Sequence, residues 1–351
     1  MANPTWMIYG ANGYTGELIA ERAAAEGLSP ILAGRRAEAI EGLAKRLGLE
    51  SRVFPLDSAA AIAKQLTDVD AILLCAGPFS KTSAPVVQAC IDTGTHYLDI
   101  TGELDVFEAC HARNAEAERA GCVLMPGVGF DVVPSDCLAA TLAKALPDAD
   151  DLELAFRGVG SPSKGTAKTM LEGIPLGVAV REAGRIENKP LAWKTKNIPF
   201  RDKTRESVTI RWGDVSTAYY STGIPNISVY MAAPRGQIRQ MKVARVMGPV
   251  LSAGPVQRFL AKQIDKRVKG PNEQARTSGQ SQLWGRVRKG SESREATLVT
   301  PEGYQLTVAT ALDSTKRVAA GEVPAGAKTP SMAFGADYIQ SFDGCDLQLR
   351  A

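Results

Sequence analysis

Three glycines at regular spacing follow a short apolar segment near the start of the chain. The segment 6–9 reads Trp-Met-Ile-Tyr, and Gly10, Gly13 and Gly16 come next in the pattern G-x-x-G-x-x-G. Good helix formers continue from residue 17. A strand, a glycine turn and a helix in this order aim unpaired helix N–H groups at an anion such as a pyrophosphate, so the turn predicts a dinucleotide site. The other expected contacts in this turn are Asn12, Tyr14 and Thr15.

The end of the second apolar segment, 30–33, distinguishes between two nicotinamide cofactors. Arg35 and Arg36 stand where an NAD site needs a carboxylate for the ribose 2′-hydroxyl. Two guanidiniums can instead form charge-assisted hydrogen bonds to a 2′-phosphate, worth ~1.5–3 kcal/mol each. The sequence therefore predicts NADP(H). The alternative interpretation is that both arginines simply begin a solvated helix.

Two later segments end where the same cofactor would pass. Asp57 follows the third apolar segment, and we expect it either to contact the adenine amine or to cap the next helix. The fourth segment ends in a turn with small residues, which let a nicotinamide ribose lie against the backbone. The residues of this turn are Ala76, Gly77, Pro78 and Phe79.

Hydride transfer is the cofactor's own chemistry, so the protein has to position the acceptor and usually supply a proton. His96 and His111 both fit structural roles. Carboxyl and hydroxyl groups gather instead after the fifth and sixth apolar segments, where ligands bind in doubly wound sheets. The candidate catalytic residues are Tyr97, Glu103, Asp131 and Ser135, and the candidate nicotinamide contacts are Gly129 and Phe130. The alternative for Asp99 and Glu103 is a turn and helix cap, and for Phe130 and Asp131 the packing of a hinge.

Six short apolar segments alternate with helical patterns between residues 6 and 131, which is typical of a parallel sheet with a Rossmann strand count. They are 6–10, 30–33, 52–56, 71–76, 97–100 and 122–126. After residue 131 the alternation stops, and longer strands and loops predict an antiparallel α+β domain. The fold class is therefore α/β, with an N-terminal doubly wound sheet and a second domain.

Composition excludes several classes of protein. At 351 residues two domains are expected, and a net charge of +3 spread along the chain gives no reason to expect a nucleic-acid partner. The six cysteines form no C-x-x-C pair, so neither a zinc site nor any other metal site is predicted. A signal peptide and an apolar span are both missing from the sequence, so a cytoplasmic location is expected.

The segment 239–269 carries eight basic residues against one acid, Asp265, with apolar residues interleaved. This composition suits a membrane surface, an acyl-CoA phosphate or an acyl-carrier protein. The alternative is a helical hairpin packed on the core with a solvated basic face.

The motifs together resemble the saccharopine dehydrogenase-like family, and in particular its short bacterial members, which include trans-acting enoyl reductases. The resemblance lies in segments 10–16, 33–36, 75–79, 97–103 and 126–136, with weaker similarity at 300–304 and 329–335. It implies an NADP-binding Rossmann domain over 1–135, an α+β substrate or oligomerisation domain over 136–325, and a C-terminal segment, 326–351, that returns to the first domain.

The resemblance leaves three functions open. The leading expectation is an NADPH-dependent reductase of an activated C=C bond on an acyl or polyketide-like substrate. The second is a C=N reductase or amino-acid dehydrogenase of the saccharopine type, which would need cations for several carboxylates. The third is an NADPH-binding sensor or assembly protein without turnover. A homodimer is compatible with all three. Cations available for the second reading are Arg157, Lys164, Lys168, Arg181 and Arg185.

Overall fold

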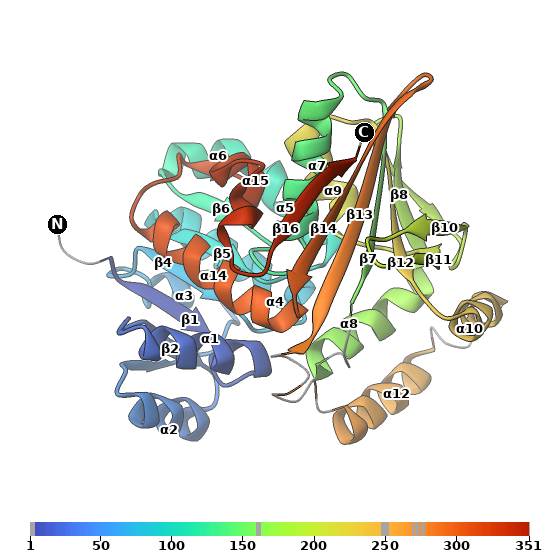
Figure 1. Cartoon of the computed structure of the whole chain (residues 1–351). Coiled ribbons are helices and arrows are strands. Elements are labelled where there is room, and N and C mark those ends of the chain that lie inside the picture. Colours follow the sequence, from blue (N-terminus) through green and yellow to red (C-terminus); the bar gives the residue numbers. More distant parts are fainter. Residues whose placement is uncertain are drawn as a thin grey trace. The chain divides into compact units, whose positions relative to one another are not determined.

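The computed structural model describes residues 4–158, 163–246, 253–268, 270, 274 and 278–350. The chain divides into two compact units (Figure 1). The first unit comprises Met1–Val133 and Tyr304–Phe334, and the second comprises Pro134–Gly303 and Gly335–Ala351.

A seven-stranded sheet forms the centre of the first unit, and all its strand pairs are parallel. Its order is β15-β6-β5-β4-β1-β2-β3, which is the Rossmann order with one strand added at the edge. The six predicted strands and the doubly wound fold are confirmed. The seventh strand, β15, was not predicted from the sequence. The strands are β1 Trp6–Tyr9, β2 Ile31–Gly34, β3 Ser51–Val53, β4 Ala71–Leu74, β5 His96–Asp99, β6 Val123–Met125 and β15 Gly326–Ala327.

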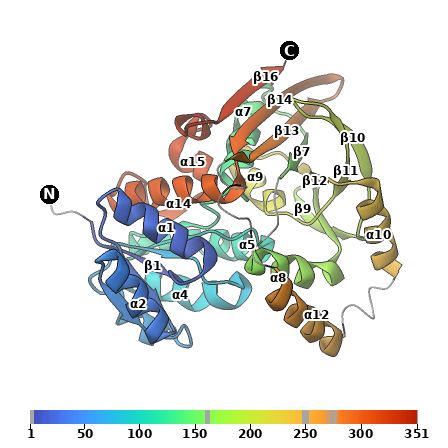
Figure 2. The ribbon, with the colours of Figure 1, turned by 60° about the horizontal axis from the view of Figure 1, so that its bottom comes forward.

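Successive residues of each strand point to opposite faces, and each face has its own apolar core. Met7 and Tyr9 of β1 belong to the core that also contains α3, α4, α5 and α6 residues. Trp6 and Ile8 belong to the other core, which α1, α2 and α14 cover. Figure 2 shows α14 beside α1. The helices of this unit are α1 Tyr14–Ala25, α2 Ala37–Leu47, α3 Ala59–Ala63, α4 Phe79–Thr93, α5 Leu104–Ala112, α6 Asn114–Ala120, α14 Gly303–Ala319 and α15 Pro330–Phe334.

A nine-stranded sheet forms the second unit, and it is mixed rather than antiparallel as expected. The main path runs β10-β11-β12-β7-β13-β14-β16, with β8 beside β12 and β9. The parallel pair is β12 with β7, because the chain between them crosses over instead of turning back as a hairpin. The strands are β7 Asp151–Arg157, β8 Val178–Glu182, β9 Arg185–Lys189, β10 Thr195–Pro199, β11 Thr204–Thr209, β12 Asn226–Ala232, β13 Gln280–Lys289, β14 Glu292–Pro301 and β16 Asp346–Arg350.

The α-helices of this part of the chain include three that the sequence pattern did not predict, α7, α8 and α9. They are α7 Val133–Ala145, α8 Lys164–Gly173, α9 Asp214–Thr222, α10 Arg235–Val246 and α12 Gly254–Arg267, and short 3₁₀ turns span Ile174–Leu176 and Tyr338–Ser341. Part of the basic segment 239–269, residues 247–252 and 269, lies outside the described residues. No helix among the described residues is long and apolar enough to cross a membrane.

The C-terminal part of the chain divides differently from the expected boundaries at 325 and 326. The return to the first unit begins earlier, with α14, whose Ala311, Leu312 and Val318 are buried against the sheet. Residues from Gly335 onward belong to the second unit, where β16 pairs with β14. The apolar face of α14 explains this division, since that face requires a sheet surface to cover it.

Candidate functional site

The strand order of the first unit reverses at β1, which pairs with β2 on one side and with β4 on the other. Ligands of doubly wound sheets bind at the carboxyl edge of this switch point. Gly10 follows β1 there with φ +85°, and a Cβ on it would lie 2.9 Å from the Cβ of Ala76, which follows β4. The structure therefore brings the glycine turn and the turn Ala76–Phe79 together, and only glycine fits at position 10.

The other two glycines leave the first turn of α1 open to an anion. Gly16 packs so closely that an added Cβ would lie 2.4 Å from the carbonyl oxygen of Gly10. Gly13 is the N-cap residue of α1 and has no side chain to occupy the first helical N–H groups, which in any α-helix lack intrahelical acceptors. The turn thus fits a pyrophosphate, as the sequence predicts. Tyr14, in the same turn, packs edge-on against Tyr304 of α14, with ring centroids 5.0 Å apart.

Two charged side chains influence Tyr9 at the end of β1: Arg35, which follows β2, and Asp57, which follows β3. The Tyr9 hydroxyl donates to the carbonyl oxygen of Phe54 at 2.7 Å. Burial raises the pKa of Tyr9 to about 12, while the charge of Arg35 lowers this pKa and that of Asp57 raises it. Both charges therefore lie near the Tyr9 hydroxyl. The N-cap residue of α3 is Ser58 rather than Asp57, so the helix-cap alternative for Asp57 does not match the helix start.

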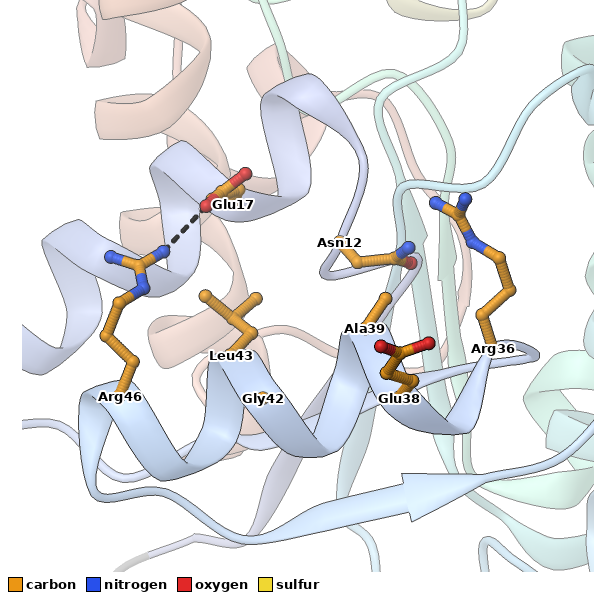
Figure 3. Close-up of a pocket in the computed structure, with 8 residues that line it drawn as sticks. All are labelled: Asn12, Glu17, Arg36, Glu38, Ala39, Gly42, Leu43 and Arg46. Carbon is orange, nitrogen blue, oxygen red and sulfur yellow. Dashed lines mark hydrogen bonds and ion pairs between the residues drawn. The ribbon is translucent and has the colours of Figure 1, made fainter.

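Arg36 occupies the N-cap position of α2 and turns toward the glycine turn (Figure 3). With the Asn12 amide oriented so that its oxygen faces the guanidinium, Arg36 donates to it from Nε at 3.2 Å and from Nη2 at 2.5 Å. Both residues line a cavity of about 520 Å³ along α1 and α2. At its other end, Arg46 forms ion pairs with Glu17 at 2.6 Å and Glu21 at 2.7 Å.

Most of the cavity lining was missed by sequence reasoning. The missed residues come from the facing sides of α1 and α2, which the helical pattern alone marks as ordinary surface. They are Glu17, Glu38, Ala39, Gly42, Leu43 and Arg46.

The loop that carries the candidate nicotinamide contacts is fastened to α14. The backbone N–H of Phe130 donates to the Thr307 hydroxyl at 3.0 Å, and the Thr310 hydroxyl donates to the carbonyl oxygen of Val128 at 2.8 Å. A Cβ on Gly129 would lie 2.9 Å from Cγ2 of Thr307. The two threonines were not predicted, because they lie far along the chain from the loop they hold.

Tyr97 and Asp99 form a buried structural pair on β5. The Tyr97 hydroxyl donates to one carboxylate oxygen of Asp99 at 2.5 Å. The other oxygen accepts from the backbone N–H groups of Thr101 at 2.9 Å and Gly127 at 2.8 Å. Burial raises the pKa of Asp99 to about 6, against the effect of these hydrogen bonds. Tyr97, a candidate catalytic residue, is fully buried and turned toward this carboxylate.

Glu103 lies at the start of α5 but caps a different helix. Its two carboxylate oxygens accept from the backbone N–H of Phe79 at 2.9 Å and of Ser80 at 2.8 Å, which begin α4. A carboxylate there also interacts favourably with the positive end of the helix dipole. This geometry matches the capping alternative, although the helix that is capped is not the expected one.

Asp131 and Ser135 fall in different units. Asp131, in the first, lies against the backbone at position 102, where a Cβ would approach its Oδ2 to 2.7 Å. Burial raises the pKa of Asp131 to about 6. Ser135, in the second unit, donates from its hydroxyl to Asp214 at 2.8 Å. Of the four candidate catalytic residues, Asp131 is therefore the one whose described geometry keeps a carboxyl with an elevated pKa at the sheet's carboxyl edge.

The histidines have the structural environments that the sequence suggested. His96 Nδ1 accepts from the backbone N–H of Val123 at 3.0 Å, and burial lowers the pKa of this histidine. Burial lowers the pKa of His111 to about 4. Both rings are therefore neutral near pH 7.

Comparison with known proteins identifies the first unit. The family model for the saccharopine dehydrogenase NADP binding domain matches residues 6–125. These residues are a saccharopine dehydrogenase NADP-binding domain. The predicted cofactor, NADP(H), and the predicted family resemblance are thereby confirmed.

Relatives of the saccharopine dehydrogenase NADP-binding domain carry two kinds of name. The trans-acting enoyl reductase of Mycobacterium tuberculosis is 33% identical over 138 residues, which cover 37% of this chain and 33% of that protein. The saccharopine dehydrogenase-like oxidoreductase of Mus musculus is 30% identical over 150 residues, covering 37% and 35%. The match thus spans about a third of the length of these relatives.

Solved structures share the fold over nearly the whole chain. Saccharopine dehydrogenase of Saccharomyces cerevisiae has a TM-score of 0.68 at 12% identity and covers 99% of this chain and 100% of its own. The homospermidine synthase of Legionella pneumophila, in complex with NAD, has a TM-score of 0.63 at 10% identity, covering 99% and 92%. The likeness establishes the fold of both units.

Replacing Asp99 by Ala is expected to destabilise the saccharopine dehydrogenase NADP-binding domain by roughly 3–9 kcal/mol, since three buried donors would lose their acceptor at ~1–3 kcal/mol each. Urea unfolding measures this change. Tyr97→Phe is the matched control, because it removes a single hydrogen bond and should cost about 1 kcal/mol. If Asp99→Ala lowered the free energy of unfolding no more than Tyr97→Phe does, Asp99 would not be the structural acceptor of these three donors.

Proposed function

We propose that the protein is an NADPH-dependent oxidoreductase that reduces an activated C=C bond in an acyl or polyketide-like substrate. NADPH held by the NADP-binding domain would supply the hydride and become NADP⁺. The similarity of this domain to trans-acting enoyl reductases supports the choice of bond.

The observation that favours C=C reduction over imine reduction is that arginines of the second unit are engaged in contacts within the protein. Arg181 is buried, donates to the carbonyl oxygens of Val215 and Gly184 at 2.8 Å each, and lies over the Tyr219 ring at 4.1 Å. Arg157 forms an ion pair with Asp202 at 3.6 Å. Two of the five cations that a saccharopine-like substrate could use for its carboxylates are therefore engaged in internal contacts, which favours a less charged substrate.

The proposed reduction adds a hydride to one carbon of the double bond and a proton to its neighbour. Asp131 is our candidate for the proton, because its pKa of about 6 leaves part of the carboxyl groups protonated near neutrality. Tyr97 and Glu103 are weaker candidates, since their described hydrogen bonds serve Asp99 and the start of α4.

The test is NADPH oxidation, followed by absorbance, with three acceptors: a 2-enoyl thioester, an α,β-unsaturated ketone and a cyclic imine carrying carboxylates. We expect the thioester to be reduced, with deuterium from labelled NADPH recovered on one carbon of the former double bond. Turnover of the imine alone would replace this proposal by the saccharopine-type reaction. Tight NADPH binding without oxidation by any acceptor would favour the sensor or assembly function.

A further inference from the structure

Two helices of the second unit, α10 and α12, carry an excess of unneutralised positive charge. The sequence of α10 contains four basic residues and no acid. Arg235 approaches Glu206 at 3.1 Å, whereas within the described part of the chain Arg239, Lys242 and Arg245 make no hydrogen bond or ion pair. The described basic side chains of α12 are likewise exposed and without such contacts; they are Arg258, Lys262, Lys266 and Arg267.

Large apolar side chains project from the same helix faces. Val243 and Val246 are 56% and 83% exposed, and each lies four residues after a basic residue of α10, so they share its face. Ile238 of α10 is buried in the apolar cluster that also contains Ala192 and Val208. The helix is therefore packed on its own unit through Ile238, while Val243 and Val246 remain exposed.

On α12 the corresponding residue is Phe259, which is 60% exposed. Lys262 and Lys266 follow it by three and seven residues and lie on the same face. The adjacent helix α8 adds Met170, also exposed, and Figures 1 and 2 both show α8 beside α12. The alternative interpretation, a helical hairpin with a solvated basic face, does not explain why an exposed phenylalanine lies among the lysines.

We propose that these faces of α10 and α12, which we call the basic helical surface, bind the surface of a membrane that contains anionic phospholipids. Lysines and arginines would lie at the level of the phosphates, while Phe259, Val243 and Val246 enter the boundary between headgroups and acyl chains. This mode requires charged and apolar groups on one face and needs no spanning helix.

The exposed, projecting apolar side chains favour a membrane over an acidic protein as the partner. Val246 and Phe259 project from their helices, as insertion between mobile lipids requires. The cations are spread over two helices, a distribution that suits a laterally continuous negative surface. A membrane-bound orientation would also bring the enzyme to acyl substrates that partition into lipid, although the proposal does not depend on the reaction.

The test is co-sedimentation of the full chain with two kinds of vesicle, phosphatidylcholine alone and equal parts of phosphatidylcholine and phosphatidylglycerol. We expect binding to the mixed vesicles only, weakening as salt is added. The triple variant Lys242→Glu, Lys262→Glu, Lys266→Glu should bind at least about 100-fold more weakly, since each lysine near an anionic surface contributes roughly fivefold. Phe259→Ser should also weaken binding while leaving its salt dependence in place.

The matched control reverses three exposed lysines elsewhere: Lys45→Glu, Lys64→Glu and Lys144→Glu. It changes net charge equally and should keep most of the binding. Retained NADPH affinity in both triple variants shows that each is folded. Equal binding to neutral vesicles, or equal losses in the two triple variants, would overturn the proposal. So would absence of vesicle binding together with lysine-dependent binding to a purified acyl carrier protein, which would assign the surface to a protein partner.

Discussion

The double variant Arg35→Asp, Arg36→Ala is expected to bind NADPH on the order of a thousandfold more weakly, while its affinity for NADH changes by less than about tenfold. Each charge-assisted hydrogen bond to the 2′-phosphate contributes ~1.5–3 kcal/mol, and about 1.4 kcal/mol corresponds to a factor of ten. The new carboxylate also repels the phosphate and can accept from the 2′-hydroxyl of NADH. Calorimetric titration with each nucleotide measures the change in preference.

Two single variants separate the phosphate contact from general damage to this region. Arg46 lines the same cavity as Arg36, but Glu17 and Glu21 engage its guanidinium, so Arg46→Ala should leave NADPH affinity within about twofold. Asn12→Ala removes the hydrogen bonds that orient Arg36 and should cost about tenfold for NADPH, with little change for NADH. Equal losses for both nucleotides in the double variant would refute the assignment of the arginines to the 2′-phosphate.

The part of this site that the sequence predicts is encoded locally. Gly10, Gly13 and Gly16 lie within one turn. The residues directly before and after the turn form the strand and the helix, and this order identifies a dinucleotide-binding turn. Arg35 follows at the end of the next strand. Local patterns of hydrophobicity and turn residues determine these elements directly, so their place at the sheet edge follows from the parallel order of the strands.

The remaining parts of the site depend on contacts that no local pattern encodes. Glu103 caps a helix that begins 24 residues earlier in the chain, and no local sequence pattern pairs the two. Thr310 holds Val128 across 182 residues, because α14 returns to the first unit after the whole of the second sheet. The role of Arg181 could not be predicted either, since its acceptors are backbone carbonyls, which have no signature in sequence.

If Asp131 supplies the proton in the proposed reduction, Asp131→Asn should lower kcat by about 10²–10⁴-fold and leave NADPH affinity unchanged. The amide matches the carboxyl in size but cannot give up a proton under these conditions. In the unaltered enzyme the donor must be protonated, and it loses its proton as the pH rises through about 6. The rate should therefore be highest below that pH and fall about tenfold for each further unit, and Asp131→Asn should abolish this dependence.

Stability measurements distinguish this chemical effect from a structural one. Because the pKa of Asp131 is raised in the folded state, its carboxyl favours folding at low pH, and this contribution is lost as the pH rises through about 6. Asp131→Asn should then be at least as stable as the unaltered protein at about pH 8, where the half-buried carboxylate would be charged. Glu103→Gln is the opposite control, since it weakens the cap of α4 by about 1–2 kcal/mol but should retain the pH dependence of the rate. If Glu103→Gln lost the pH dependence of the rate and Asp131→Asn kept it, Glu103 rather than Asp131 would be the proton donor.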